Sequence, residues 1–130
     1  MRVAIFQICV DPRLNHELVR IQVRQQLARR YLQADRVVLV NEIGGNMGGS
    51  FASTLDLFLR DGAEIVLCGV LHHDDCLAAK HGLRRPLQET AAQIQNLVRG
   101  RGLECPVETG TIYTETNHVQ WDSTAQRMSP

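Results

Sequence analysis

The stretch Val3-Ala-Ile-Phe-Gln-Ile-Cys-Val10, followed at once by Asp11-Pro12-Arg13, decides how this chain folds. It is a short, mostly apolar run without a breaker, which is typical of a strand buried on both faces. Asp11-Pro12 ends the strand. Three side chains that can carry chemistry, those of Cys9, Asp11 and Arg13, therefore lie at its carboxyl end.

A second stretch has the same organisation. Glu64-Ile-Val-Leu-Cys-Gly-Val-Leu71 predicts another buried strand, and His72-His-Asp-Asp-Cys76 follows just beyond its carboxyl end. Shorter signals complete the pattern along the chain. They are a buried strand at residues 36–40, a strand or hairpin at 106–121, a helix capped by Asn15 that runs to Leu32, a helix capped by Ser50 that runs through Leu59, and a helix from Pro86 to about Arg99.

Strands that alternate with helices predict right-handed crossovers and a mainly parallel sheet. We therefore expect a three-layer α/β/α fold with a central sheet of four to five strands. A chain of 130 residues with 44% hydrophobic residues can bury one core, so residues 1–130 are expected to form a single domain. In such sheets ligands bind beyond the carboxyl ends of the strands.

Cys9, His73 and Cys76 offer two thiolates and an imidazole at these strand ends. Three protein ligands with a free fourth position are typical of catalytic zinc, whereas structural zinc is usually closed by four. His72 is an alternative to His73, although the His-x-x-Cys spacing favours His73. A disulfide between Cys9 and Cys76, in a thiol redox protein, is the alternative to a metal.

Asp11 and Arg13 have a role beside a zinc ion. Zinc lowers the pKa of bound water from about 15.7 towards 7. A carboxylate such as Asp11 can accept a hydrogen bond from the resulting hydroxide and orient it. Arg13 can hold that carboxylate in place and keep it ionised. Small carbonyl-type electrophiles such as CO2 suit this arrangement.

Cys-x-Asp-x-Arg after the first strand and His-x-x-Cys after the third resemble the signature of the β-class carbonic anhydrases. Residues 39–45 (Leu-Val-Asn-Glu-Ile-Gly-Gly) and 107–113 (Val-Glu-Thr-Gly-Thr-Ile-Tyr) resemble that family's second strand and late strand. The resemblance implies reversible hydration of CO2 to bicarbonate. It also implies a homodimer or higher homo-oligomer with the active site near the subunit interface. The implied zinc ligands are Cys9, His73 and Cys76, and the implied catalytic pair is Asp11 and Arg13.

The chain departs from the family pattern at several positions. Leu77 stands where the family usually has Gly and brings a bulky side chain close to the metal. Pro12 replaces Ser, and Glu42 falls in a segment that usually reads Asn-Ala-Gly. Because the first strand begins almost at residue 1, we also expect the family's N-terminal helical arm to be lacking. Two further functions therefore stay open. One is a non-catalytic zinc protein with a structural or regulatory role, and the other is a related CS2 or COS hydrolase.

Composition excludes other classes of function. Lys plus Arg equals Asp plus Glu at 14 each, so no electrostatic footprint predicts binding to nucleic acid or a membrane. No signal peptide or membrane span is evident, which predicts a reduced cytoplasmic setting. Cys68 is expected in the core and Cys105 as an incidental thiol. A cluster of arginines is expected to form a solvated helix face (Arg20, Arg24, Arg29 and Arg30).

Overall fold

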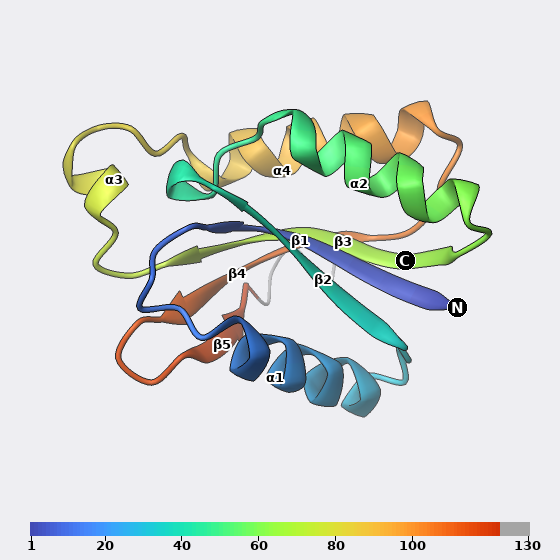
Figure 1. Ribbon diagram of the computed structural model, residues 1–130, viewed down its shortest axis with the longest axis horizontal. Helices are drawn as coiled ribbons and strands as arrows, with labels where there is room; N and C mark the ends of the chain where they lie inside the picture. The colour runs from blue at the N-terminus through green and yellow to red at the C-terminus, as the bar shows by residue number, and fades with distance from the viewer. Residues whose placement is uncertain (123–130) are drawn as a thin grey trace.

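The computed structural model describes residues 1–122 and has one five-stranded sheet between two layers of helices (Figure 1). The strand order is β2-β1-β3-β4-β5, in which β1 to β4 are parallel and β5 runs antiparallel to β4. This confirms the predicted α/β fold with a mainly parallel sheet. The strands are β1 (Arg2–Cys9), β2 (Arg36–Glu42), β3 (Glu64–His73), β4 (Val107–Tyr113) and β5 (His118–Trp121).

Helices cover both faces of the sheet. Helix α1 (His16–Arg29) lies on one face, while α2 (Gly49–Arg60) and α4 (Leu87–Gly100) lie on the other (Figure 1). Two short helices, η1 (Ile43–Gly45) and α3 (Leu77–Lys80), follow the carboxyl ends of β2 and β3. None of the helices in residues 1–122 is long and apolar enough to cross a membrane.

The alternation of side chains along β1 divides the core into two clusters. Phe6 and Ile8 pack in the cluster on the α1 face, whereas Val3 and Ile5 pack in the cluster under α2 and α4. All four side chains are fully buried. Strand β1 is therefore apolar on both faces, which explains the mostly apolar run in the sequence.

Several element ends differ from the sequence prediction. β3 continues to His73, two residues beyond its predicted end, because His72 and His73 pair with Thr111 and Ile112 of β4. Pro86 is the N-cap of α4 and not its first residue. The chain between residues 106 and 121 is a hairpin, one of the two predicted forms. The predicted cap of α1 is present, since Asn15 Oδ1 accepts a hydrogen bond from the Leu18 amide at 3.0 Å.

The topology places the two sequence motifs side by side. β1 and β3 are neighbours, and their register pairs Ile8 with Leu71. Parallel strands end at the same edge of a sheet, so the residue after Ile8 and the segment after Leu71 meet there. Cys9 and His73 thus come together although 64 positions separate them in the sequence.

Candidate metal centre

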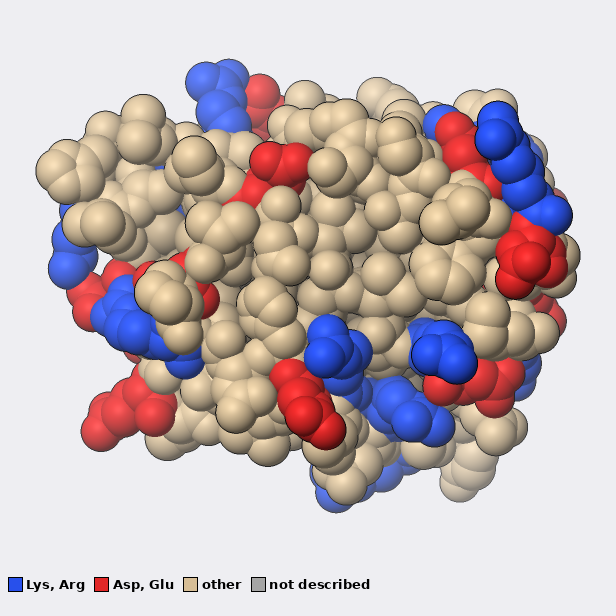
Figure 2. Space-filling view, in the orientation of Figure 1, with Lys and Arg blue, Asp and Glu red and all other residues tan. Residues whose placement is uncertain are grey.

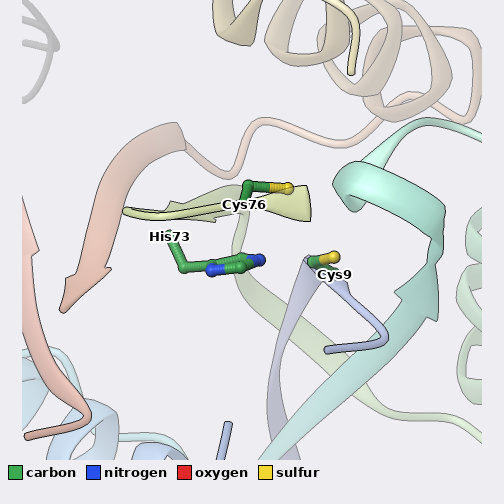
Figure 3. A group of neighbouring side chains, drawn as sticks. All are labelled: Cys9, His73 and Cys76. Atoms are coloured by element: carbon green, nitrogen blue, oxygen red, sulfur yellow. The ribbon is translucent and has the colours of Figure 1, made fainter. Parts of the chain in front are cut away.

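Cys9, His73 and Cys76 form one cluster of possible metal ligands (Figure 3). Their two sulfurs and one imidazole nitrogen lie within 4.8 Å of one another, and all three residues are buried. Cys9 ends β1, His73 ends β3, and Cys76 precedes α3. Among residues 1–122 no other group of three His, Cys, Asp or Glu side chains is arranged in this way.

The hydrogen bonds of His73 leave one ring nitrogen available for a metal. Nδ1 lies 2.8 Å from the carbonyl oxygen of Asp74, which can only accept, so Nδ1 carries the proton. Nε2 then has a free lone pair. It is buried and has no hydrogen-bond partner. A metal-ligating histidine usually donates its other N–H to such an oxygen. The orphaned Nε2 therefore fits a metal.

The two thiols complete a donor set of sulfur, nitrogen and sulfur. Burial raises the pKa of Cys9, so without a cation this thiol would stay protonated at neutral pH. A bound divalent cation reverses this effect, because coordination deprotonates a thiol outright. Thiolates with imidazole are the ligands that zinc prefers.

Asp11 is an ionised carboxylate beside these donors. Arg13 donates to it through Nε at 3.0 Å, Nη2 at 2.7 Å and the backbone N–H at 2.9 Å. These bonds lower the pKa of Asp11 to about 2. Asp11 Oδ2 lies 3.8 Å from His73 Nε2. The structure thus brings together all five residues singled out in the sequence, while their functional roles stay predictions.

Asp75 makes a contact that the sequence did not reveal. Its carboxylate accepts from Arg13 Nη1 at 2.8 Å and pairs with Lys80 at 2.5 Å, and its carbonyl accepts from Arg13 Nη2 at 2.7 Å. Asp75 has a φ of 51°, in the left-handed region, which directs the turn towards Arg13. Asp75 precedes Cys76 directly. Arg13 thus ties the end of β1 to the segment that carries Cys76.

The acidic pair after His73, Asp74 and Asp75, lies in a bend of the chain between β3 and α3. Asp74 accepts from the backbone N–H of Thr114 at 2.6 Å and from its hydroxyl at 2.7 Å. Helix α3 begins after Cys76 without any side-chain cap. These contacts depend on the hairpin of β4 and β5, so the spacing of residues 73–76 alone contained no signal for them.

A cavity of about 270 Å³ opens beside the cluster. Cys9, Asp11 and His81 provide its polar wall. Leu77 lines it with a side chain that is 63% exposed, so this residue lies at the opening of the cavity. The other lining residues are almost all apolar (Val10, Pro12, Ile43, Gly44, Ala78 and Leu83).

The glycine turn of η1 forms one wall of this cavity. Gly44 and Gly45 have φ angles of 66° and 70°, which favour glycine. A Cβ on Gly44 would lie 3.2 Å from the Cβ of Arg84. Asn46, just after the turn, donates to the carbonyl of Leu83 at 2.6 Å and accepts from the amide of Arg85 at 2.8 Å. These contacts fix the turn against the segment after α3.

Comparison with known proteins gives a result at the level of structure only. No family model matches the sequence, and no curated protein matches it. Among solved structures, the carbonic anhydrase of Streptococcus mutans has a TM-score of 0.56 at 17% identity, covering 92% of this chain and 80% of that one.

Two further structures agree. The carbonic anhydrase of Glaciozyma antarctica has a TM-score of 0.53 at 18% identity and covers 92% of this chain and 80% of that one. The Coccomyxa β-carbonic anhydrase in complex with acetazolamide has a TM-score of 0.57 at 14% identity, with 92% and 71% covered. At sequence identities this low, structural similarity establishes the fold. This chain therefore has the fold of the β-carbonic anhydrases, as its two motifs predicted.

Proposed function

We propose that this protein is a zinc-dependent enzyme that hydrates CO2 reversibly to bicarbonate. The observation that carries the proposal is the convergence of two thiols and an unpartnered imidazole nitrogen within 4.8 Å, with an ionised carboxylate 3.8 Å from that nitrogen. Cys9, His73 and Cys76 would hold the ion. Zinc bound there would supply the Lewis acidity that makes water nucleophilic at neutral pH.

Asp11 and Arg13 would orient the reacting water. Because Arg13 keeps Asp11 ionised, the carboxylate is always an acceptor at neutral pH. It can therefore accept a hydrogen bond from the water and direct its lone pair at the substrate. Arg13 is itself held by the Asp75 carboxylate, so the orientation is set before substrate arrives.

The cavity fits a small uncharged substrate. Apart from Cys9, Asp11 and His81, its wall is apolar or glycine, which suits CO2 better than an ion. CS2 and COS have the same linear shape and lack of charge, so they are assayed as competing substrates. A cytoplasmic location, where thiols stay reduced, is part of this proposal.

We infer that the protein works as a homodimer or a higher homo-oligomer. Four apolar side chains at the cavity are between 48% and 63% exposed (Val10, Ile43, Leu77 and Leu83, the apolar collar). Exposed apolar groups that cluster in this way are typical of interaction surfaces. Two β-carbonic anhydrases of Sordaria macrospora with this fold are tetrameric.

Stopped-flow CO2 hydration by the zinc-loaded protein tests the activity at neutral and at alkaline pH. We expect Arg13→Ala to retain zinc and to lose about 100-fold in kcat/KM, because misplacing a catalytic group by about 1 Å costs that much. Asp11→Ala should lose a similar factor. Asp61→Ala, an exposed carboxylate at the opposite end of the sheet, is the matched control and should keep full activity.

Three outcomes separate the alternatives. Zinc-loaded protein that hydrates no CO2 at either pH contradicts the proposed activity and favours the non-catalytic zinc protein. Turnover of CS2 or COS without CO2 hydration assigns the hydrolase. Full activity in Arg13→Ala would show that this residue does not orient Asp11.

A further inference from the structure

The four cysteines fall into two pairs on opposite faces of the sheet. Cys9 and Cys76 belong to the core cluster on the α1 face. Cys68 belongs to the cluster under α2 and α4, and Cys105 packs against that same cluster. The sheet therefore separates Cys68 and Cys105 from the candidate zinc ligands. Cys68 and Cys105 therefore have no role in the candidate metal centre.

Backbone pairing brings Cys68 and Cys105 together. Cys68 lies on β3, and its amide donates to the carbonyl of Pro106 at 3.1 Å. The strand register pairs Cys68 with Val107, the first residue of β4. Cys105 precedes Pro106 directly, so it enters the sheet beside Cys68. No local sequence pattern indicated this proximity, since 37 positions separate the two residues.

The thiols of Cys68 and Cys105 differ in solvent exposure and in acidity. Cys68 is fully buried, whereas Cys105 is partly exposed. The interaction of each thiol with the other lowers the pKa of Cys105 and raises the pKa of Cys68. A thiol with a lowered pKa and access to solvent is the one that oxidants attack first. The buried thiol next to it has the position of a resolving cysteine.

We propose that Cys68 and Cys105 form a peroxide-sensitive thiol pair that closes to a disulfide, independently of the zinc centre. The Cys105 thiolate attacks one oxygen of hydrogen peroxide. The S–O bond forms, the O–O bond breaks, and hydroxide leaves and takes up a proton. The sulfur of Cys68 then attacks the sulfenic sulfur of Cys105. The S–S bond forms and the S–O bond breaks, and water leaves with the thiol proton of Cys68. The two thiols give two electrons to peroxide, and two waters form.

The disulfide would tie the segment before β4 to the central strand β3. It would close a long loop of chain that contains α3 and α4. Such a cross-link restricts the unfolded chain, which raises the melting temperature as long as the native geometry is kept. The ligands of the candidate metal centre lie on the other face and would keep their thiols.

Peptide mapping of the zinc-loaded protein after treatment with hydrogen peroxide tests the proposal. Free thiols are alkylated before digestion, without any reductant. Trypsin alone leaves Cys68 and Cys76 in one peptide (residues 61–80), so a second protease that cleaves before aspartate is needed. It separates residues 61–73, with Cys68, from residues 75–80, with Cys76. The expected product joins residues 61–73 to the peptide that carries Cys105, with the loss of two hydrogen atoms.

Cys105→Ser is the matched variant. It should leave Cys68 free for alkylation after peroxide, and peroxide should raise the melting temperature of the wild-type protein but not of this variant. The proposal fails if Cys105 is oxidised to sulfinic acid while Cys68 is still alkylated, because the two sulfurs would then be too far apart. It also fails if the only disulfide joins Cys9 to Cys76. Neither result depends on CO2 hydration, so the outcome is independent of the proposed activity.

Discussion

A single hydrogen bond prepares His73 for its proposed role. Because Nδ1–H of His73 donates a hydrogen bond to the Asp74 carbonyl, the opposite nitrogen, Nε2, faces the two thiols with its lone pair. His72, the alternative ligand considered from the sequence, points to the other side of β3. Burial there lowers the pKa of His72 to about 4. The neighbouring histidines thus have different environments because side chains alternate along a strand.

His16, at the start of α1, gives a pH-dependent prediction. Burial lowers its pKa below the ordinary 6.5, and Arg20 one turn later acts in the same direction. The neutral form is therefore the one that the fold favours. The neutral His16 ring therefore contributes to the free energy of unfolding in full above pH 6.5. This contribution is lost as the pH falls through the lowered pKa that His16 has in the folded state.

NMR titration of the His16 ring measures this pKa directly. We expect a midpoint below 6.5 in the wild-type protein and a higher midpoint in Arg20→Gln. Arg29→Gln, at the far end of the same helix, should not move the midpoint. A wild-type midpoint at or above 6.5 would show that the fold does not disfavour the charged ring.

Among the elements, α1 and β4 are joined by an ion pair whose carboxylate is buried. Arg30 follows α1 and makes a two-point salt bridge with Glu108 of β4, whose side chain is 2% exposed. Arg30 also lies over the ring of Trp121 at 6.0 Å. Arg30 is exposed, in keeping with the predicted solvated face, but its guanidinium also has a partner on the strand beneath the helix, which the spacing within the helix could not reveal.

We expect Arg30→Ala to lower the free energy of unfolding by about 3 kcal/mol, because it leaves the Glu108 carboxylate buried without its partner. Urea unfolding measures the change. Arg29→Ala removes an exposed arginine at the neighbouring position and should cost much less. Equal costs for the two variants would mean that the ion pair between Arg30 and Glu108 contributes little.

The elements that the sequence predicted are those with strong local signals. The buried strands β1 and β3 follow from unbroken apolar runs, and α1 follows from helical spacing behind Asn15. The candidate ligands were found because they follow such strands. The sequence was compatible with β1 and β3 as neighbours but did not predict it, because strand order depends on long-range packing.

The structural features that the sequence did not predict depend on contacts between segments that are far apart along the chain. The length of β3 is set by β4, and the contact of Asp75 with Arg13 needs both strand ends in place. Helix α3 has four residues, too few for a periodic signal. The proximity of Cys68 and Cys105 likewise arises from strand pairing.

At the scale of the whole molecule, basic and acidic residues are equal in number. Figure 2 shows one face on which acidic and basic side chains are mixed, without a continuous basic surface. This agrees with the balance of 14 basic and 14 acidic residues. The surface feature that stands out in the described residues is the apolar collar around the cavity.

The apolar collar predicts self-association. We expect light scattering to give at least twice the mass of one chain, which is 14.6 kDa. Ile43→Glu should shift the protein towards the monomer, because a charge in a buried interface is costly. Leu57→Glu, on the outer side of α2 at 65% exposure, should leave the assembly intact. A wild-type protein that is monomeric at every concentration would contradict the proposed oligomer.

The most direct test of the whole account is the metal content of freshly purified protein that has been kept reduced. Elemental analysis should find one zinc per chain. It should find none in Cys9→Ser or His73→Ala, because each variant removes one of three ligands. Cys105→Ser should keep its zinc. Wild-type protein without stoichiometric metal, or Cys9→Ser that retains zinc fully, would contradict the claim that β1 and β3 hold one ion between them.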